Sequence, residues 1–370
     1  MDKIVYLDNA ATTRTLDEIR DAIEYAENNL YFNTAAMYAG SLRSRKAVGD
    51  ASAIIKKRLT KSGSGNLIFT SGATESNNMV ILGIATNLRH HVLVVSGEHS
   101  SVHSPAVYLS NQGFDVEYVP LNSDGTVDLV ALERLVRPNT ALFVFGMVNS
   151  DTGVMQDVEA IVRVVRGRNS KAHIHCDAVQ AFCKFDFDVD KLGLDSVAIS
   201  AHKIYGPKGI GALWLRKGVN LKSIMYGGAQ QDFRPGTEDT PRVMGFTMAV
   251  QTFDTCANAG KVAQLRNRLT SGLTKDCVIN GKQNNPYIIN ISLPNNILGA
   301  TVVNALSECG IYVGLGSACA TNSAKNRTLL AMGLTEKQTK QVIRVSLGIK
   351  NTECDVDVFL MELKRCLNCL

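Results

Sequence analysis

The sequence has no long run of apolar residues and no long run of basic ones. No apolar stretch among its 370 residues is long enough to span a bilayer, so no membrane partner is expected. Residues 1–8 contain no apolar signal core, and the predicted location is therefore cytoplasmic. The net charge of +5 is small, and no nucleic-acid partner is predicted.

Cysteine usage excludes a disulfide framework. The nine cysteines are an odd number scattered through a chain too large to need covalent staples, which favours reduced thiols. Cys366 and Cys369 form one C-x-x-C pair, but no second pair and no histidine pair follows at zinc-finger spacing. We predict no metal site, and a redox role for this pair stays open.

The order of apolar segments indicates an α/β fold. Short runs rich in Val, Ile and Phe alternate with segments of helical spacing, which predicts a mostly parallel, seven-stranded type of sheet covered by helices. The expected strands are 67–69, 91–96, 116–120, 141–148, 172–176, 195–200 and 209–215. The expected helices between and before them are 15–29, 42–59, 75–88, 104–112, 129–135 and 158–166.

The last third of the chain has a different pattern. A helical stretch at 251–267 leads into shorter mixed segments, which predict a smaller α+β domain. We expect a large domain over 15–255 and a small domain made of 1–14 and 256–370.

Chemically suggestive residues gather where the expected strands end. In a parallel sheet covered by helices, ligands bind beyond the carboxyl ends of the strands. The segments at those ends are 70–74, 97–99, 149–153, 177–180 and 200–203.

Lys203 is the focus of this set. A Ser-x-His-Lys strand ending followed by Gly-Pro-x-Gly puts an amine on a rigid turn. An amine held there can lose its proton by desolvation and act as a Schiff-base nucleophile. The alternative is an ordinary solvated loop lysine, and only the other strand ends argue against it.

The other strand ends supply partners for one ligand. The helix start at 71–77 offers backbone N–H groups and the Thr74 hydroxyl to an anion, or it is simply a good N-cap. Asp177 is either a helix cap or the partner of a protonated ring nitrogen, and Gln180 could reach the same ligand. His99 is either structural or stacks on a flat ring and moves protons. Together with Lys203 these residues are what pyridoxal 5'-phosphate needs.

The motifs resemble those of a known family. The sequence is similar to the cysteine desulfurases of the NifS/IscS type, in the class V aminotransferase group of fold-type I pyridoxal-phosphate enzymes. The motifs that carry the resemblance run in family order through nearly the whole chain, at 6–13, 70–78, 97–99, 175–180, 200–203, 234–238, 316–319 and 343–348.

The resemblance implies a role for each of these positions. Cofactor binding is expected from Lys203, Asp177, Gln180, His99, Thr74, Ala73, Ser200, His202, Thr237 and Ser150. Within this set Lys203 forms the Schiff base, Asp177 pairs with the ring nitrogen, His99 stacks on the ring and Gln180 bonds the ring hydroxyl. Thr74, Ser200 and His202 hold the phosphate, and Thr237 reaches the cofactor of the other subunit in a homodimer. Substrate binding is expected from Arg344, Asn33 and Asn149, with Arg344 clamping the carboxylate.

Cys319 is implied as the nucleophile. Its surroundings, residues 314–323, are small and polar, and Lys325 and Arg327 nearby favour a thiolate. The implied catalytic residues are thus Lys203, Cys319 and His99. L-cysteine is expected to become L-alanine while its sulfur stays on Cys319 as a persulfide. A scaffold or thiolation protein would accept the sulfur, as in iron-sulfur cluster assembly.

Two segments depart from the family pattern. The family's Asn-Pro-Ser-Ser-x-His run is replaced by Asn33-Thr-Ala-Ala-Met-Tyr, and its Asn-Asn-Glu-x-Gly by Asn149-Ser-Asp-Thr-Gly. Both departures are expected near the substrate entrance. They keep two alternatives open: a selenocysteine lyase or related lyase or aminotransferase, and a protein that acts mainly as a sulfur-relay binding partner.

Overall fold

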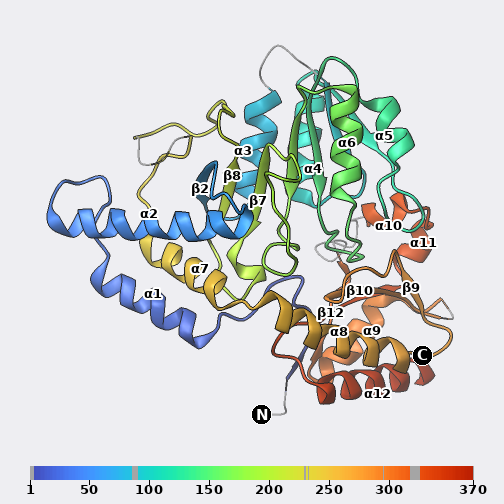
Figure 1. The fold of residues 1–370 in the computed structure, drawn as a ribbon. Coiled ribbons are helices and arrows are strands. Elements are labelled where there is room, and N and C mark those ends of the chain that lie inside the picture. Colours follow the sequence, from blue (N-terminus) through green and yellow to red (C-terminus); the bar gives the residue numbers. More distant parts are fainter. Residues whose placement is uncertain are drawn as a thin grey trace.

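A seven-stranded sheet forms the centre of the protein (Figure 1). The computed structural model describes residues 4–85, 91–228, 231, 233–294, 296–316 and 326–369. The strand order in the sheet is β2-β8-β7-β6-β5-β3-β4. The strands are β2 (Asn66–Thr70), β3 (His91–Val95), β4 (Asp115–Val119), β5 (Thr140–Gly146), β6 (His173–Asp177), β7 (Ser196–Ser200) and β8 (Gly211–Leu215).

Six of these strands run in one direction. β8 is antiparallel to both of its neighbours, β2 and β7, whereas β7, β6, β5, β3 and β4 pair in parallel. The predicted mostly parallel α/β sheet is therefore confirmed. Because β2 and β7 point the same way, their carboxyl ends meet at the edge where β8 begins.

Alternate residues along the strands face two different hydrophobic layers. Val92 and Val94 pack with α3 (Ala73–Ala85) and α4 (Ser100–Asn111) on one face. Leu93 and Val95 pack on the other face, whose layer draws on α2, α6 and α7. This alternation is the period of two expected of a strand covered on both sides. The further helices of this part are α1 (Asp17–Asn29), α2 (Ala39–Leu59), α5 (Leu129–Leu135), α6 (Val158–Arg168) and α7 (Thr240–Thr252).

The remaining elements build a second core, seen at the lower right of Figure 1. β9 (Val278–Asn280), β10 (Ile288–Ser292) and β12 (Val342–Ser346) form an antiparallel sheet of order β12-β10-β9. β1 (Val5–Tyr6) pairs in parallel with β11 (Ile311–Tyr312), so the N-terminal segment joins this core. The helices here are α8 (Thr255–Gly272), α9 (Gly299–Glu308), α10 (Arg327–Ala331), α11 (Glu336–Thr339) and α12 (Glu353–Cys369). The exact domain limits, 15–255 against 1–14 and 256–370, stay a prediction.

The stretch expected as one helix at 251–267 is divided. α7 ends at Thr252, and α8 begins at Thr255 after Asp254, whose side chain accepts the Ala257 N–H as an N-cap. The single predicted helix was therefore wrong, because a capping aspartate inside a helical pattern starts a new helix. No helix in the described part of the chain is long and apolar enough to cross a membrane.

Candidate active site

A cleft opens at the carboxyl edge of the large sheet. It is lined by side chains from the ends of β3, β5 and β6, from the start of α3, and from the turn after β7. Eight of the predicted site residues line it, namely Ala73, Thr74, His99, Asn149, Ser150, Asp177, Gln180 and Lys203. Glu98 and Ser101 line it as well, although no function was assigned to them from the sequence.

The start of α3 lies against the end of β7 and the start of β8. A Cβ added to Gly211 would lie 2.6 Å from the Ile199 carbonyl oxygen and 2.8 Å from the Cα of Gly72. Only glycine at the start of β8 allows this close approach. The first turn of α3, with its backbone N–H groups at Ala73 and Thr74, therefore faces the same cleft as the strand ends.

Lys203 ends the short 3-10 helix η1 (Ala201–Lys203) that follows β7. Its Nζ donates to the carbonyl oxygens of Ala10 and Ala11, each at 2.6 Å. Burial, helped by the Arg344 guanidinium, lowers the pKa of Lys203 from 10.5 to about 8. The predicted strand-end amine is therefore desolvated and is not an ordinary solvated lysine.

Asp177, the last residue of β6, is held by two donors. Its Oδ2 accepts from Asn77 Nδ2 at 2.8 Å, and its Oδ1 accepts from the Val179 N–H at 3.0 Å. Glu98 is a second carboxyl in the cleft, and its Oε1 accepts from the Gly146 N–H at 2.8 Å. Burial, with the nearby Asp177, raises the pKa of Glu98 to about 8. Glu98 therefore keeps its proton at neutral pH.

His99 caps the N-terminus of α4. Its Nδ1 accepts from the Ser101 N–H at 3.1 Å and lies 2.8 Å from Ser101 Oγ. An accepting Nδ1 leaves the proton of the neutral ring on Nε2. His99 thus offers a donor at its far ring nitrogen.

Gln180 is fixed by a buried lysine that sequence reasoning missed. Gln180 Nε2 donates to the Ala10 carbonyl at 2.9 Å, and its Oε1 accepts from Lys184 Nζ at 3.0 Å. Burial, together with the charge of Lys203, lowers the pKa of Lys184 to about 7. Lys184 Nζ also lies 5.4 Å from the centre of the Tyr287 ring. Its spacing of four residues from Gln180 was the available signal.

Arg344, on β12, does not line the cleft but contacts one of its lining residues, Ser150. Its Nη1 donates to the Ser150 carbonyl at 3.0 Å, and its Nη2 pairs with Asp8 Oδ1 at 2.7 Å. Its Nε is buried and has no hydrogen-bond partner among the described residues. Asn149 folds back on its own loop, where its Oδ1 accepts the N–H groups of Asp151 and Thr152. The guanidinium is thus anchored on one side by Asp8.

The remaining predicted residues do not line the cleft. Ser200 is buried at the end of β7, and His202 Nδ1 lies 3.1 Å from Thr12 Oγ1. Asn33 and Thr237 are exposed. Cys319 falls in 317–325, outside the described residues.

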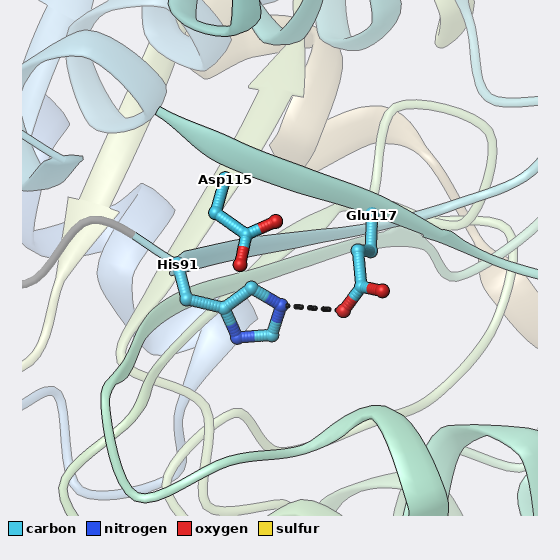
Figure 2. Close-up of side chains that lie close together, drawn as sticks. All are labelled: His91, Asp115 and Glu117. Carbon is cyan, nitrogen blue, oxygen red and sulfur yellow. Dashed lines mark hydrogen bonds and ion pairs between the residues drawn. The ribbon is translucent and has the colours of Figure 1, made fainter. Parts of the chain in front are cut away.

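A second charged cluster lies at the opposite, amino edge of the sheet (Figure 2). His91 Nε2 is 3.0 Å from Glu117 Oε2. The side chains of His91, Asp115 and Glu117 lie close enough together that they could hold a metal ion. Both carboxylates, however, already bind the Arg137 guanidinium. Each carboxylate is therefore already paired with the one guanidinium, and the cluster is an ion-pair network.

The comparisons with known proteins agree with this geometry. The pattern of the Aminotransferase class-V family matches residues 5–359. "Cysteine desulfurase IscS 1" of Archaeoglobus fulgidus is 35% identical over 369 residues, covering 97% of this chain and 95% of the relative. "Cysteine desulfurase IscS" of Clostridium botulinum (strain Kyoto / Type A2) is 32% identical, with 99% and 94% covered.

Solved structures of similar fold belong to the same group of proteins. A "NIFS-LIKE PROTEIN" superposes with a TM-score of 0.93 at 34% identity and covers all of both chains. "SspA in complex with cysteine" superposes with a TM-score of 0.82 at 29% identity, covering 94% of this chain and 99% of that one. The fold and the strand-end cleft thus define an enzyme class whose members generally use pyridoxal phosphate. The chain belongs to the class V aminotransferase family, and its resemblance to the NifS/IscS type is confirmed.

Proposed function

We propose that this protein is a pyridoxal-phosphate-dependent cysteine desulfurase that moves the sulfur of L-cysteine onto Cys319 and releases L-alanine. The observation that carries the proposal is the amine of Lys203. Its pKa is lowered to about 8, and it faces a cleft that also contains the carboxylate of Asp177. Family membership with cysteine desulfurases over nearly the whole chain supports the same reaction.

The cleft residues fit pyridoxal 5'-phosphate by their chemistry. A partly neutral amine suits its aldehyde, and a doubly hydrogen-bonded carboxylate suits a protonated ring nitrogen. The α3 N-terminus suits its phosphate, which Ala73 and Thr74 would hold; Ser200 and His202 flank the turn with Lys203 and are proposed as further partners, although they do not line the cleft. Burial lowers the pKa of His202 to about 4, so His202 would act as a neutral hydrogen-bonding partner.

When bound, the cofactor supplies an electron sink for bonds made and broken next to the substrate amine. The chain supplies the rest. Lys203 holds or accepts the proton at the substrate Cα, because its pKa lies near neutrality. His99 offers the Nε2 proton, and Arg344 orients the substrate carboxylate. Asn149, Ser150 and Asn33 would complete the substrate entrance.

The sulfur transfer balances without an added oxidant. The Cys319 thiolate attacks the substrate sulfur, so an S–S bond forms and the S–Cβ bond breaks. The electron pair left on Cβ takes up the proton of the substrate thiol, which makes the methyl group of alanine. Cys319 then carries a persulfide that a thiol of a scaffold or thiolation protein would accept.

Exposed apolar residues support a homodimer. Tyr31, Met37, Tyr38 and Leu42 are each more than half exposed around the α1–α2 connection. Thr34 Oγ1 donates to Glu238 Oε2 at 2.6 Å, which ties this segment to the turn that contains Thr237. Thr237 does not line the cleft of its own chain, as expected if it serves the other subunit.

The protein is proposed to act in the cytoplasm. All eight cysteines of the described residues are unpaired thiols, which suits a reducing compartment.

The first test is Lys203→Ala. Apo-protein is incubated with pyridoxal 5'-phosphate, and the visible absorption band and alanine formation from L-cysteine are measured. The wild type is expected to show both, and Lys203→Ala is expected to lose the band and at least about a thousandfold in rate. A band that survives in Lys203→Ala would contradict the cofactor assignment.

A second test separates the substrates and the nucleophile. L-cysteine and L-selenocysteine are compared as substrates, and the mass added at Cys319 is measured. Alanine formation that persists in Cys319→Ala would remove the persulfide route. Faster turnover of selenocysteine would favour the lyase alternative, for which the shorter Ser150 is the motivating feature.

A further inference from the structure

Asn77 lies on α3 behind the cleft and is fully buried. It makes three side-chain hydrogen bonds: Nδ2 to Asp177 Oδ2 at 2.8 Å, Nδ2 to Ser101 Oγ at 2.9 Å, and Oδ1 to His175 Nε2 at 2.9 Å. The buried amide therefore uses both of its hydrogens and one of its acceptor positions on protein partners.

The directions of these bonds follow from Asp177. A carboxylate only accepts hydrogen bonds, so the amide nitrogen of Asn77 must face it. The amide oxygen then faces His175, which must carry its proton on Nε2. The orientation of Asn77 is thus fixed by chemistry on both sides.

The chain of donors continues away from the cleft. His175 Nδ1 is 2.8 Å from Ser196 Oγ, and Ser196 Oγ is 2.7 Å from His173 Nε2. Because Nδ1 of His175 is an acceptor, the Ser196 hydroxyl donates to it, and Ser196 in turn accepts from His173 Nε2–H. Burial lowers the pKa of His173 to about 4 and of His175 to about 3, so both rings stay neutral. In this chain of three bonds, each donor then points toward Asn77: His173 donates to Ser196, Ser196 to His175, and His175 to Asn77 Oδ1.

A branch of the same network reaches His99. Ser101 Oγ accepts the second amide hydrogen of Asn77, and it lies beside Nδ1 of His99. The Ser101 backbone N–H also donates to that nitrogen. Asn77 is therefore connected to both groups proposed to face the cofactor ring, directly to Asp177 and through Ser101 to His99.

We infer that Asn77 is a positioning residue for the cofactor: its amide N–H holds the Asp177 carboxylate toward the ring nitrogen and, through Ser101, it keeps His99 oriented with its proton on Nε2. The inference rests on the cofactor roles proposed above for Asp177 and His99. Without the Asn77 donor the carboxylate loses one of its two fixed hydrogen bonds and turns from the ring nitrogen, so its pairing with the protonated ring weakens. Asn77 thereby sets how strongly the ring attracts electrons, although it does not touch the ring.

The direction of the network is tested first in the wild type. Protein labelled with ¹⁵N at its seven histidines is studied by NMR, with signals assigned by single histidine variants. We expect His173, His175 and His99 to carry the neutral-ring proton on Nε2. A proton on Nδ1 of His175 would overturn the inference, whether or not the protein binds the cofactor.

The consequence for the cofactor is tested with Asn77→Ala. Pyridoxal 5'-phosphate labelled with ¹⁵N in its ring is bound to the wild type and the variant. We expect the ring-nitrogen signal to move toward the unprotonated value in Asn77→Ala, and the cofactor Kd to rise about tenfold, the scale of one charge-assisted hydrogen bond. Asn78→Ala is the matched control, because Asn78 Nδ2 only bonds the Thr74 carbonyl of its own helix at 2.8 Å.

A second variant guards against misfolding of Asn77→Ala. Ser101→Ala removes only the His99 branch, at a helix start where alanine is well tolerated. We expect it to leave the ring-nitrogen signal unchanged and to shift the ¹⁵N signals of His99. Unchanged His99 signals in Ser101→Ala, or a wild-type ring signal in folded Asn77→Ala, would overturn the inference. Failure of the wild type to bind the cofactor would instead overturn the proposed function.

Discussion

The two edges of the large sheet both gather a histidine, carboxylates and a basic residue, and among the described residues those at the carboxyl edge line a cleft. At the amino edge, Arg137 binds both Asp115 and Glu117, and Glu117 also lies beside His91. At the carboxyl edge, Lys203 donates to two carbonyl groups and no carboxylate binds it directly. At the amino edge both carboxylates are paired with one guanidinium, whereas at the carboxyl edge the amine of Lys203 is paired with carbonyl groups alone and lines a cleft. The difference shows that a functional site is recognised by unmatched groups and not by the density of charge.

Arg344→Lys is expected to have the largest effect among the changes that test this contrast. A lysine cannot hold Asp8 and a substrate carboxylate at once, because it lacks the planar fork of arginine. We expect kcat/KM for L-cysteine to fall about tenfold to a hundredfold, mainly through KM. Steady-state kinetics measure this, with the cofactor band as the control that should stay intact. An unchanged KM would mean that Arg344 does not bind the substrate.

The pH dependence of cofactor capture tests the state of Lys203. Only the neutral amine attacks an aldehyde, and the lowered pKa of about 8 makes roughly half of it neutral at pH 8. The rate at which apo-protein develops the visible band should therefore rise about tenfold per pH unit below 8 and level off above it. Stopped-flow absorbance between pH 6.5 and 9.5 measures this rate. A rate that still rises steeply at pH 9.5 would indicate an ordinary lysine.

Lys184→Met should have a smaller effect. The variant keeps a long side chain in the buried space but leaves Gln180 Oε1 without its donor. We expect a loss of about threefold to tenfold in cofactor affinity, measured by equilibrium titration. The matched variant Lys171→Met, on the connection between α6 and β6, should leave the affinity unchanged.

Arg137→Ala should have the smallest effect on function. It removes the cation that balances Asp115 and Glu117, so the pKa of His91, which this cation helps to lower, should rise. The ion pairs are partly exposed, and we expect a stability loss of only about 0.5–1 kcal/mol. Cofactor affinity and desulfuration should match the wild type. If Zn²⁺ stabilises Arg137→Ala but not the wild type, then the Arg137 guanidinium takes the place that a metal ion would have between Asp115 and Glu117.

Most of the architecture was predictable because its causes are local. Periodic apolar runs predicted each strand of the large sheet to within a few residues, and α5 was predicted at its observed limits of Leu129–Leu135. The helical stretch expected at 251–267 is divided at the Asp254 N-cap, and α7, which packs against α1 and α2, was not predicted. β1 and β12 were not predicted as strands; β1 has only two residues, too few to show a period of two.

The residues of the candidate site also divide into those that the sequence predicted and those that only the structure revealed. Residue type and strand-end position were enough to select Lys203, Asp177, His99 and Thr74. They did not reveal the half-buried Glu98 or the buried Lys184 as groups with shifted pKa values, because burial is a property of the assembled core. The connection from Asn77 to Asp177 spans 100 residues of sequence, and no local pattern encodes it.

The sequence by itself determined the family, the type of sheet and the edge of the sheet where the reactive residues lie. Strand periodicity and the residues at strand ends are local patterns that can be identified from the order of amino acids alone. Only the tertiary structure decided which charges are matched and which are left facing a cleft, since that depends on what each side chain is packed against. Lys203 and Arg137 are both single basic residues in the sequence. In the fold, Lys203 becomes a desolvated amine, whereas Arg137 becomes part of an ion-pair network.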